Sequence, residues 1–330
     1  MSDGKIFQMS SNSSWNLISI EESRHRERFA TLLKEIEKGL PYSGVEPVVS
    51  PRPKTIVLGL DALYLLDKSI DPCDVVLVSL TYDLEDGVLT NNDLMILKSM
   101  AQHGSRFIVD CQASQEKIIS KIHDESRILK IVYGADINSL LKVPFEKGKT
   151  LEMICTRTWN ELHNNFLLIE ALSKFSNLGK VFVNMAHPGD SISSKIRSEI
   201  PPNVEFFWFY YYDNTELIEL LSNSWMYVST SPIDGASISL MEALSAGRIC
   251  LVSDIEANKE FIEDGRNGFV FETNSVESLS ARIREINDLK SEELVEISNN
   301  ARITAREYAD WELNSQVIKE YILEASVDIK

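Results

Sequence analysis

Two carboxylates, Asp234 and Glu242, frame a short turn and the start of the run SISLMEALSA, which favours a helix. The first amides of a helix lack intrahelical partners and lie at the positive end of its dipole, where phosphate binds readily. The small residues Gly235, Ala236 and Ser237 let a ligand approach the backbone closely. A diphosphate could therefore bind at this turn while the carboxylates accept hydrogen bonds from sugar or ribose hydroxyls.

A simpler interpretation of Asp234 and Glu242 stays open at this point. An Asp directly before a helix is commonly its N-cap, and a single Glu among apolar residues commonly lies on the exposed stripe of an amphipathic helix. Buried carboxylates without a partner are rare, which favours this interpretation when the stretch is taken alone.

Short apolar runs typical of buried strands alternate with helical runs on both sides of a break near residues 143–150. This order predicts an α/β fold with two doubly wound parallel sheets. We expect an N-terminal domain over 1–145, a C-terminal domain over 146–308, and a helix over 309–330 that packs back on the first domain. Ligands are expected in a crevice between the domains, at the carboxyl ends of the strands.

The expected elements follow the chain in this order. The strands are predicted over 55–60, 73–80, 105–110, 128–134, 151–156, 180–185, 204–209, 225–231 and 249–254. The helices are predicted over 20–39, 91–104, 115–124, 164–175, 193–200, 214–224, 237–247, 276–289 and 311–325.

Length and composition limit the class of protein. A chain of 330 residues suits two domains of about 150 residues each. The N-terminus lacks the apolar centre of a signal peptide and no apolar run approaches the roughly 20 residues that cross a bilayer, so we expect a cytoplasmic location. The four cysteines lie in or beside apolar runs without metal-ligand spacing, and we expect them to be reduced core residues.

The net charge of −17 argues against a nucleic-acid partner, which would need a basic surface. Most of this negative charge lies in the C-terminal half of the chain. The N-terminal half is therefore compatible with peripheral contact at the inner face of a membrane.

The line STSPIDGASISLMEALSAGRICLVSDIEANKEFIEDGRNGFVF, residues 229–271, resembles the retaining glycosyltransferases of GT-B architecture called glycosyl transferases group 1, or family four. That family typically reads SxxEGFGLxxLEAMAxGxPVVxSDxGGxxExIxDGxNGxL, so order and spacing agree over a long stretch. The resemblance covers about residues 125–325. It implies two Rossmann-like domains that bind a nucleotide-sugar donor as substrate, with no cofactor and no metal ion.

The resemblance also implies a role for each residue of the turn. Glu242 matches the second glutamate of the family's Glu-x7-Glu pattern, which holds the nucleotide ribose. Asp234 stands in place of the first glutamate, which lies close to the transferred sugar, and its side chain is one methylene shorter. The family's Gly-Phe-Gly-Leu, whose backbone amides meet the sugar and phosphate, is replaced by Gly235, Ala236, Ser237 and Ile238.

A second segment, ICTRTWNELHNNFLLIEAL over 154–172, resembles the family's VGRLxxxKGxxxLIEAL. Arg157 matches the arginine, and His163, counted back from the helix, falls where the lysine normally stands. In the family both cations face the donor diphosphate and offset the charge that grows on the leaving group. A histidine supplies less charge than a lysine at pH 7. The alternative is that both side chains are exposed to water.

Acceptor recognition is expected in the N-terminal domain, where the resemblance is weak and residues 1–20 lack the family's Gly-Gly loop. Asp110 and His103 are the polar candidates there, and a structural role is favoured for each because a strand-end carboxylate often caps the next element. The aromatic run FFWFYYYD over 206–213 suggests stacking on a base or sugar. Core packing explains its first half, which leaves Tyr210–Tyr212 as pocket candidates.

These observations predict a metal-independent enzyme that transfers a sugar, with retention of anomeric configuration, from a UDP- or GDP-sugar to an acceptor hydroxyl. The acceptor is expected to be a glycan, a lipid-linked molecule or another hydroxyl compound in polysaccharide or glycoconjugate biosynthesis. Asp234, Arg157 and His163 are the expected catalytic residues. Two rivals remain: an inactive GT-B-like binding or partner subunit, and an enzyme of the same fold with other chemistry, such as a nucleotide-sugar epimerase.

Overall fold

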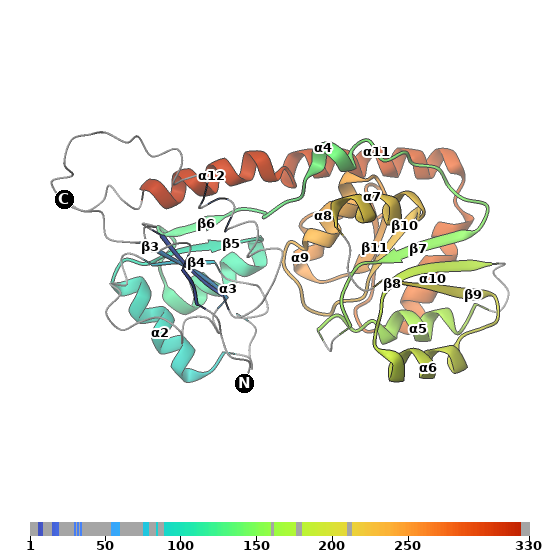
Figure 1. Cartoon of the computed structure of the whole chain (residues 1–330), viewed down its shortest axis with the longest axis horizontal. Helices are drawn as coiled ribbons and strands as arrows, with labels where there is room; N and C mark the ends of the chain where they lie inside the picture. The colour runs from blue at the N-terminus through green and yellow to red at the C-terminus, as the bar shows by residue number, and fades with distance from the viewer. Residues whose placement is uncertain are drawn as a thin grey trace. The chain divides into compact units, whose positions relative to one another are not determined.

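The computed structural model describes residues 6–8, 15–19, 30, 32, 34, 54–59, 75–78, 84, 89–159, 162–175, 180–209 and 213–324. The chain divides into two compact units, the first made of residues 1–133 and 312–330 and the second of residues 134–311. Each unit holds a six-stranded sheet (Figure 1). Cys73 and Tyr210–Tyr212 lie outside the described residues, and of the predicted helix over 20–39 only residues 30, 32 and 34 are described, all helical.

The first unit has its strands in sequence order, with β1 antiparallel to β2 and all other neighbours parallel. Its strands are β1 (Ile6–Gln8), β2 (Trp15–Ser19), β3 (Lys54–Leu58), β4 (Val75–Val78), β5 (Arg106–Val109) and β6 (Ile128–Lys130). Its helices are α2 (Asn91–Gln102), α3 (Gln112–Ile122) and most of α12 (Trp311–Glu324).

The core of this unit forms where the helices between successive strands cover the sheet. Val57, Leu77 and Phe107 are fully buried and pack with Leu97 of α2 and Ile118 of α3. Parallel strands buried on both faces read as continuous apolar runs, which is why the sequence pattern identified them.

Local signals fix the start of α2. The Thr90 hydroxyl accepts a hydrogen bond from the Asp93 amide at 3.2 Å, and the Asp93 carboxylate accepts one from the Thr90 amide at 2.8 Å. This reciprocal pair satisfies amides that have no partner within the helix.

The second unit is an all-parallel sheet in the order β12-β11-β10-β7-β8-β9. Its strands are β7 (Leu151–Cys155), β8 (Val181–Ala186), β9 (Val204–Phe209), β10 (Met226–Ser229), β11 (Ile249–Ser253) and β12 (Phe269–Phe271). Its helices are α4 (Ile137–Leu140), α5 (Phe166–Leu172), α6 (Asp190–Glu199), α7 (Asn214–Ser222), α8 (Ile238–Ser245), α9 (Glu256–Lys259), α10 (Val276–Asp288) and α11 (Ser291–Tyr308).

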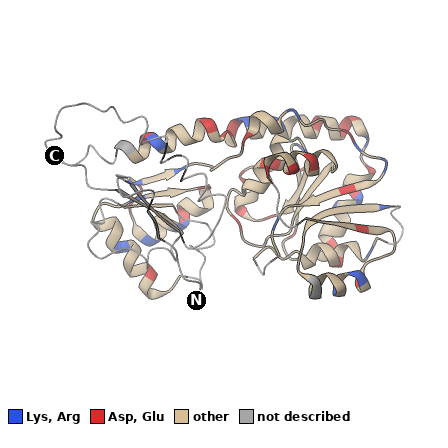
Figure 2. Cartoon of the chain, in the orientation of Figure 1, with Lys and Arg blue, Asp and Glu red and all other residues tan. Residues whose placement is uncertain are grey.

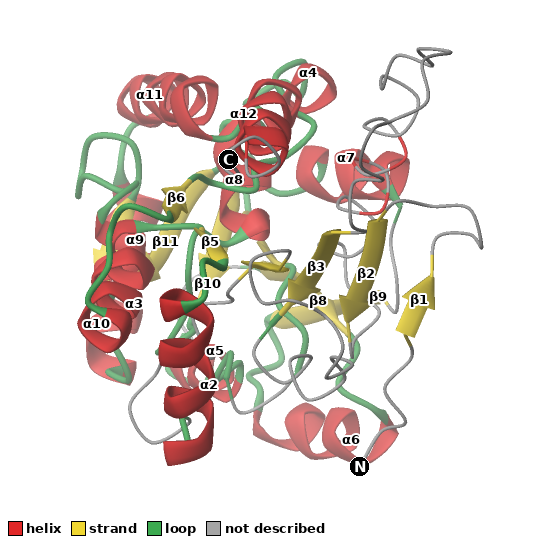
Figure 3. Ribbon diagram, turned by 90° about the vertical axis from the view of Figure 1, so that its left-hand side faces the viewer, coloured by secondary structure: helices red, strands yellow, loops and turns green. Residues whose placement is uncertain are grey.

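Helices lie on both sides of the strands in this unit (Figures 1 and 3). On one face Met153 and Val228 of the sheet pack with Leu168 of α5 and Ile283 of α10. Helix α8 lies on the other face and contacts α11. Most charged residues lie on helices and loops, whereas the strands are largely uncharged (Figure 2). No helix in the described part of the chain is long and apolar enough to span a membrane.

The structure corrects the predicted list of elements at one long segment. Helix α11 was not predicted, although Leu294, Ile297, Ala301 and Ala305 are buried at helical spacing. Two of these four positions are alanines, and the pair Asn299–Asn300 interrupts the apolar pattern, so the periodicity was too weak to recognise.

The cysteines agree with the prediction where they are described, because Cys111, Cys155 and Cys250 are free and buried.

A buried guanidinium holds the start of the second unit in place. Arg248 is 1% exposed, and it donates to the carbonyls of Ala246 at 2.8 Å, Leu221 at 3.0 Å, Ser224 at 2.9 Å and Pro144 at 2.6 Å. Two of these carbonyls lie at the C-terminal ends of α7 and α8, where the helix dipole is negative. Burial and the nearby Arg302 lower the pKa of Arg248 to about 10.

We expect Arg248→Met to lower the free energy of unfolding by about 3 kcal/mol, because it leaves several buried carbonyls without a donor. Urea unfolding followed by circular dichroism measures this loss. The control is Arg266→Met, since Arg266 makes an exposed ion pair with Glu263 and such pairs contribute about 0–1 kcal/mol. Equal losses in the two variants would contradict the structural role of Arg248.

Candidate functional site

The candidate site lies where the strand order of the second unit reverses. The chain runs from β7 outward to β9 and then returns to β10 on the opposite side of β7. Strands β7 and β10 are parallel neighbours, with Tyr227 opposite Ile154. Arg157 follows the carboxyl end of β7, and the turn with Asp234 follows the carboxyl end of β10. Ligands bind at this kind of reversal in open parallel sheets.

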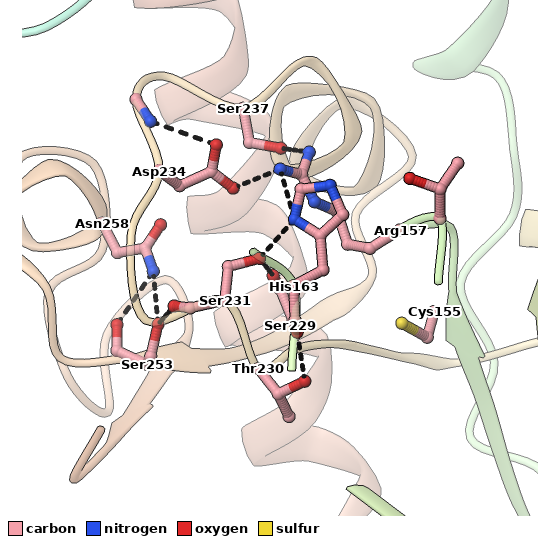
Figure 4. Close-up of polar contacts among 12 residues, drawn as sticks. Cys155, Arg157, His163, Ser229, Thr230, Ser231, Asp234, Ser237, Ser253 and Asn258 are labelled. Atoms are coloured by element: carbon pink, nitrogen blue, oxygen red, sulfur yellow. Dashed lines mark hydrogen bonds and ion pairs between the residues drawn. The ribbon is translucent and has the colours of Figure 1, made fainter. Parts of the chain in front are cut away.

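The Arg157 guanidinium is the centre of the site (Figure 4). Its Nη2 lies 2.6 Å from Asp234 Oδ2 and 3.2 Å from His163 Nδ1, and its Nη1 donates to Ser237 Oγ at 2.8 Å. The side chains of Arg157 and Asp234 are each 14% exposed. Four residues singled out in the sequence are thus brought together, and Arg157 is not the water-exposed strand-end residue that the alternative interpretation required.

Asp234 does not cap the helix that follows it. Helix α8 begins at Ile238 with Ser237 as its N-cap, and the Ser237 side chain makes no capping hydrogen bond. The Asp234 carboxylate instead accepts from the Gly235 amide at 3.1 Å and pairs with Arg157. The N-cap interpretation is therefore wrong for this residue.

Glu242 does not lie on an exposed stripe. It is 4% exposed and belongs to a helix whose residues are nearly all buried, including Leu240, Met241 and Ala243. Ala236 and Ile238 of the turn are also buried, at 2% and 7% exposure. The amphipathic interpretation of Glu242 is wrong, and the turn is a tightly packed element rather than a loose loop.

His163 has one protonation form that its contacts allow. A guanidinium can only donate hydrogen bonds, so His163 Nδ1 accepts from Arg157, and the ring hydrogen is assigned to Nε2. The Ser231 hydroxyl, 3.1 Å from the same Nδ1, is then also a donor. Burial and the positive charge of Arg157 lower the pKa of His163 to about 3. Histidine is therefore neutral here, and it offers one N–H group where the family has a cation.

The charge states of Arg157 and Asp234 depend on each other, because the two side chains form an ion pair. Burial opposes the charged form of Arg157, but Asp234, together with nearby Tyr227 and Cys155, more than offsets it, so the pKa of the guanidinium is raised. Burial also raises the pKa of the Asp234 carboxyl, and Arg157 opposes that rise. A separation of 2.6 Å is that of a charge-assisted hydrogen bond, so each group stabilises the charge of the other.

A further set of polar contacts holds the loop that carries Arg157 and His163. Asn165 Nδ2 donates to the carbonyls of Arg157 at 3.2 Å and Thr158 at 3.1 Å. Thr230 Oγ1 donates to the carbonyl of His163 at 3.0 Å. These partners were not predicted, because Thr230 is distant in the sequence and the contacts of Asn165 depend on how the loop folds back on the start of α5.

Asn164 occupies a position with a left-handed backbone, at φ 43°. The family pattern has glycine directly after its lysine, and Asn164 follows His163 in the same way. Asparagine is one of the few residues that tolerate this conformation, so the loop keeps its path without the glycine.

The polar candidates of the first unit make local structural contacts. Asp110 is 6% exposed and accepts from Ser114 Oγ of α3 at 2.9 Å, while His103 ends α2 and its Nδ1 lies 2.7 Å from the Ser99 carbonyl. Both contacts agree with the structural role favoured from the sequence.

Among the described residues, no group of three or more His, Cys, Asp or Glu side chains could hold a metal ion.

Comparison with known proteins matches a family model to the part of the chain that contains His163 and the turn with Asp234. Residues 160–304 match the family described as Glycosyl transferases group 1. The UDP-N-acetylglucosamine--peptide N-acetylglucosaminyltransferase GtfA subunit of Streptococcus gordonii is 24% identical over 195 residues, which are 58% of this chain and 38% of that protein. The chain thus spans about two fifths of the length of this curated relative.

Solved structures extend the likeness to most of the chain. TarM of S. aureus is 19% identical with a TM-score of 0.63, over 83% of this chain and 55% of TarM. HepE of Anabaena, in complex with UDP-glucose, is 16% identical with a TM-score of 0.65, over 82% of this chain and 78% of HepE. The predicted fold class, GT-B with two Rossmann-like domains, is confirmed.

We expect His163 to remain neutral, with its hydrogen on Nε2, at every pH above about 4 in the free protein. Because its folded pKa lies below the unfolded value of 6.5, the free energy of unfolding is greatest above pH 6.5 and falls as the pH drops toward 3. Long-range ¹H–¹⁵N spectra identify the tautomer, and His163→Gln should remove this part of the pH dependence. Titration of the ring near pH 6.5 would contradict the assigned contacts.

Proposed function

We propose that this protein transfers a sugar from a UDP-sugar to an acceptor hydroxyl, and that the turn from Asp234 to Glu242 is the donor site. The observation that carries the proposal is the buried cluster of Arg157, Asp234 and Ser237 at the N-terminus of α8. It combines a cation, a carboxylate and helix amides at a strand-order reversal. The matched family segment includes this turn.

The proposed roles follow from what each group can do. The donor diphosphate lies at the N-terminus of α8, where the amides of residues 235–238 and the Arg157 guanidinium stabilise the charge that grows on the leaving group. His163 donates its Nε2 hydrogen to the same diphosphate. Glu242 accepts hydrogen bonds from the ribose and Asp234 from the transferred sugar.

No side chain is proposed as a nucleophile or as a metal ligand. We infer retention of configuration, in which a leaving phosphate oxygen takes the proton of the incoming hydroxyl as that hydroxyl attacks the same face of the sugar. Positioning and charge stabilisation then supply the rate.

The ion pair suggests how donor binding prepares the site. In the free protein the charge of Arg157 is balanced by Asp234. A diphosphate within reach of Arg157 competes for the same guanidinium hydrogens, because both anions accept from it. As Arg157 turns toward the phosphate, the Asp234 carboxylate becomes available to the sugar hydroxyls. Binding of the nucleotide and orientation of the sugar are thereby linked.

The nature of the similar proteins supports the donor class. The GtfA name specifies UDP-N-acetylglucosamine and a peptide, and HepE is in complex with UDP-glucose. We therefore favour UDP over GDP, and we extend the acceptor class from glycans and lipid-linked molecules to peptide hydroxyls. A cytoplasmic location, with peripheral membrane contact through the first unit, belongs to the same proposal.

A second candidate function is a binding or partner subunit without turnover. The observation that favours it is the charge of the site, since His163 is neutral and Arg157 is compensated by Asp234 before any ligand binds. Such a site binds a diphosphate less strongly than one with two free cations. Binding of a nucleotide sugar without transfer or hydrolysis of the sugar would favour the function as a binding or partner subunit.

We expect a UDP-sugar to raise the unfolding temperature of the protein, because a ligand that binds only the folded state stabilises it by mass action. Thermal unfolding against UDP-, GDP-, ADP- and dTDP-sugars identifies the donor, and product analysis with that donor tests transfer. Glu242→Gln keeps the buried shape of the side chain but removes its charge, and it should reduce the shift. No shift with any nucleotide sugar would contradict the proposed donor site.

We expect Asp234→Asn to separate nucleotide binding from transfer. The change removes the carboxylate that competes for Arg157, so UDP should bind about threefold to tenfold more tightly. Loss of the sugar contact should lower the transfer rate about 100-fold. Calorimetry with UDP and a radiolabelled transfer assay measure the two effects.

The matched control is Asp264→Asn, because Asp264 pairs with Arg282 outside the candidate site. This control should leave both UDP affinity and transfer unchanged. Weaker UDP binding in Asp234→Asn, or an unchanged transfer rate, would contradict the proposed exchange of partners at Arg157.

A further inference from the structure

The two edges of the second sheet differ in how they are protected. Edge strand β12 has three residues, both of its phenylalanines are buried, and the Val270 amide donates to the Asp264 carboxylate at 2.9 Å. Edge strand β9 has six residues, VEFFWF, with one charged side chain and no proline. An edge strand has unpaired backbone N–H and C=O groups that can bind another strand. Proteins usually prevent this with a short edge strand, with charged side chains, or with a covering segment. Only β12 follows that rule.

Core packing accounts for Phe206 and Trp208 of β9, which pack against the core of the unit, but not for Phe207. Phe207 is 50% exposed and Glu205 is also exposed, whereas Phe206 and Trp208 are partly buried on the opposite face. The rings of Phe206 and Trp208 are stacked with centroids 5.0 Å apart, and Phe207 lies beside Phe182 of β8 at 5.8 Å. Both faces of the strand therefore carry aromatic rings up to the edge.

The hydrogen bonds of β9 to β8 fix which backbone groups point away from the sheet. The Asn203 carbonyl accepts from the amide of Val181, the first residue of β8, at 2.9 Å, and the Phe209 carbonyl accepts from the amide of His187, directly after β8, at 2.8 Å. Residues along a strand alternate in the side to which they bond, so the odd-numbered residues face β8. The N–H and C=O groups of Phe206 and Trp208 consequently point outward, and no strand lies beyond them in the described part of the chain.

We propose that β9 pairs antiparallel with β9 of a second copy of this chain, so that one sheet runs through both copies. In a symmetric antiparallel pair, residues with outward groups must lie opposite each other. The Val204 amide already donates to the Pro201 carbonyl at 3.0 Å, which leaves Phe206 and Trp208 as the outward residues of the proposed pair. The register that uses both in each copy places Phe206 opposite Trp208 of the other copy, and Trp208 opposite Phe206. Four hydrogen bonds form between outward N–H and C=O groups, and Phe207 lies opposite its own symmetry copy on the two-fold axis.

This register also matches the side chains. Residues opposite each other in an antiparallel pair point to the same face, so the even-numbered aromatics of both copies share one face and the Phe207 rings share the other. The Phe207 pair has no backbone hydrogen bonds between its members, which is the pair type with the closest side chains. A shift by one residue would place the outward groups of one copy opposite residues that already bond to β8.

The charges and the surface beside β9 are compatible with a second copy of the same strand as the binding partner. The Glu205 carboxylate lies 4.0 Å from the Lys180 ammonium of its own chain. It therefore needs no cation from the second copy. A groove of about 360 Å³ runs beside the strand and is lined by Arg197, Pro201, Phe206 and Trp208. In the paired arrangement the aromatic side of this groove continues into the second copy. The proposal does not depend on the donor site or its chemistry.

The experiment compares the oligomeric state of the full chain and two variants by sedimentation velocity over a wide range of concentration. The unaltered protein should show a concentration-dependent dimer. Phe207→Glu places two like charges opposite each other on the axis and should weaken dimerisation at least about tenfold. Ile303→Glu is the matched control, because Ile303 is 58% exposed on α11, and it should leave the dimer unchanged. Circular dichroism and unfolding temperature verify that both variants fold.

A cross-link tests the register. Phe207→Cys places two thiols on the axis, within the Cβ separation of about 3.5–4.5 Å that a disulfide requires, so mild oxidation should give a covalent dimer. The unaltered chain and Ile303→Cys should not cross-link under the same conditions. A protein that is monomeric at all concentrations, a dimer that persists in Phe207→Glu, or a monomer that binds an unrelated extended peptide through β9 would overturn the proposal.

Discussion

The ion pair between Arg157 and Asp234 is the interaction on which the candidate site depends. Removing two charges from water is costly, and the mutual attraction offsets that cost only when the remaining hydrogen-bonding groups also find partners. Ser237 and His163 supply two of these partners, and Asn165 holds the backbone of the loop that carries Arg157. The strand reversal between β7 and β10 brings the two charges together, since it places the ends of two neighbouring strands beside one buried turn.

Helix α8 connects this pair to the rest of the second unit. Its N-terminus carries Ser237 and the amides of the turn, while the carbonyl of Ala246 at its other end accepts from Arg248 at 2.8 Å and from Arg302 at 3.1 Å. The same two guanidinium groups donate to the carbonyls of Pro144 and Val143, which precede β7. The helix is thus held at both ends by guanidinium groups that are buried or partly buried. A shift of α8 along its axis would break contacts at the site and at the segment before β7 together.

The sequence predicted most strands and helices because buried parallel strands read as apolar runs and the helices between them show clear periodicity. A long motif of fixed spacing also singled out Arg157, His163 and Asp234, and the structure brings these three side chains together. The sequence did not identify the pairing of Arg157 with Asp234, because the directions of two side chains 77 positions apart are set by tertiary packing. Helix α11 was missed because alanines replace larger apolar residues. The exposure of Phe207 depends on β9 being an edge strand, which a local pattern does not reveal.

Two of the departures from the family pattern, at His163 and Asp234, act on the charge of Arg157. Replacing the lysine by His163 removes a cation, and Asp234 pairs with the remaining cation, so the polar side chains of the free site carry no excess positive charge. In the proposed donor site, attraction for a diphosphate comes from two sources that do not titrate near neutral pH: the amides at the N-terminus of α8, and an Arg157 guanidinium that turns from Asp234 to the phosphate. Ser237 lies at the junction of both, because its backbone begins the helix and its hydroxyl accepts from Arg157. A serine at this position, where the family pattern has glycine, therefore fixes the orientation of the Arg157 guanidinium at the N-terminus of α8.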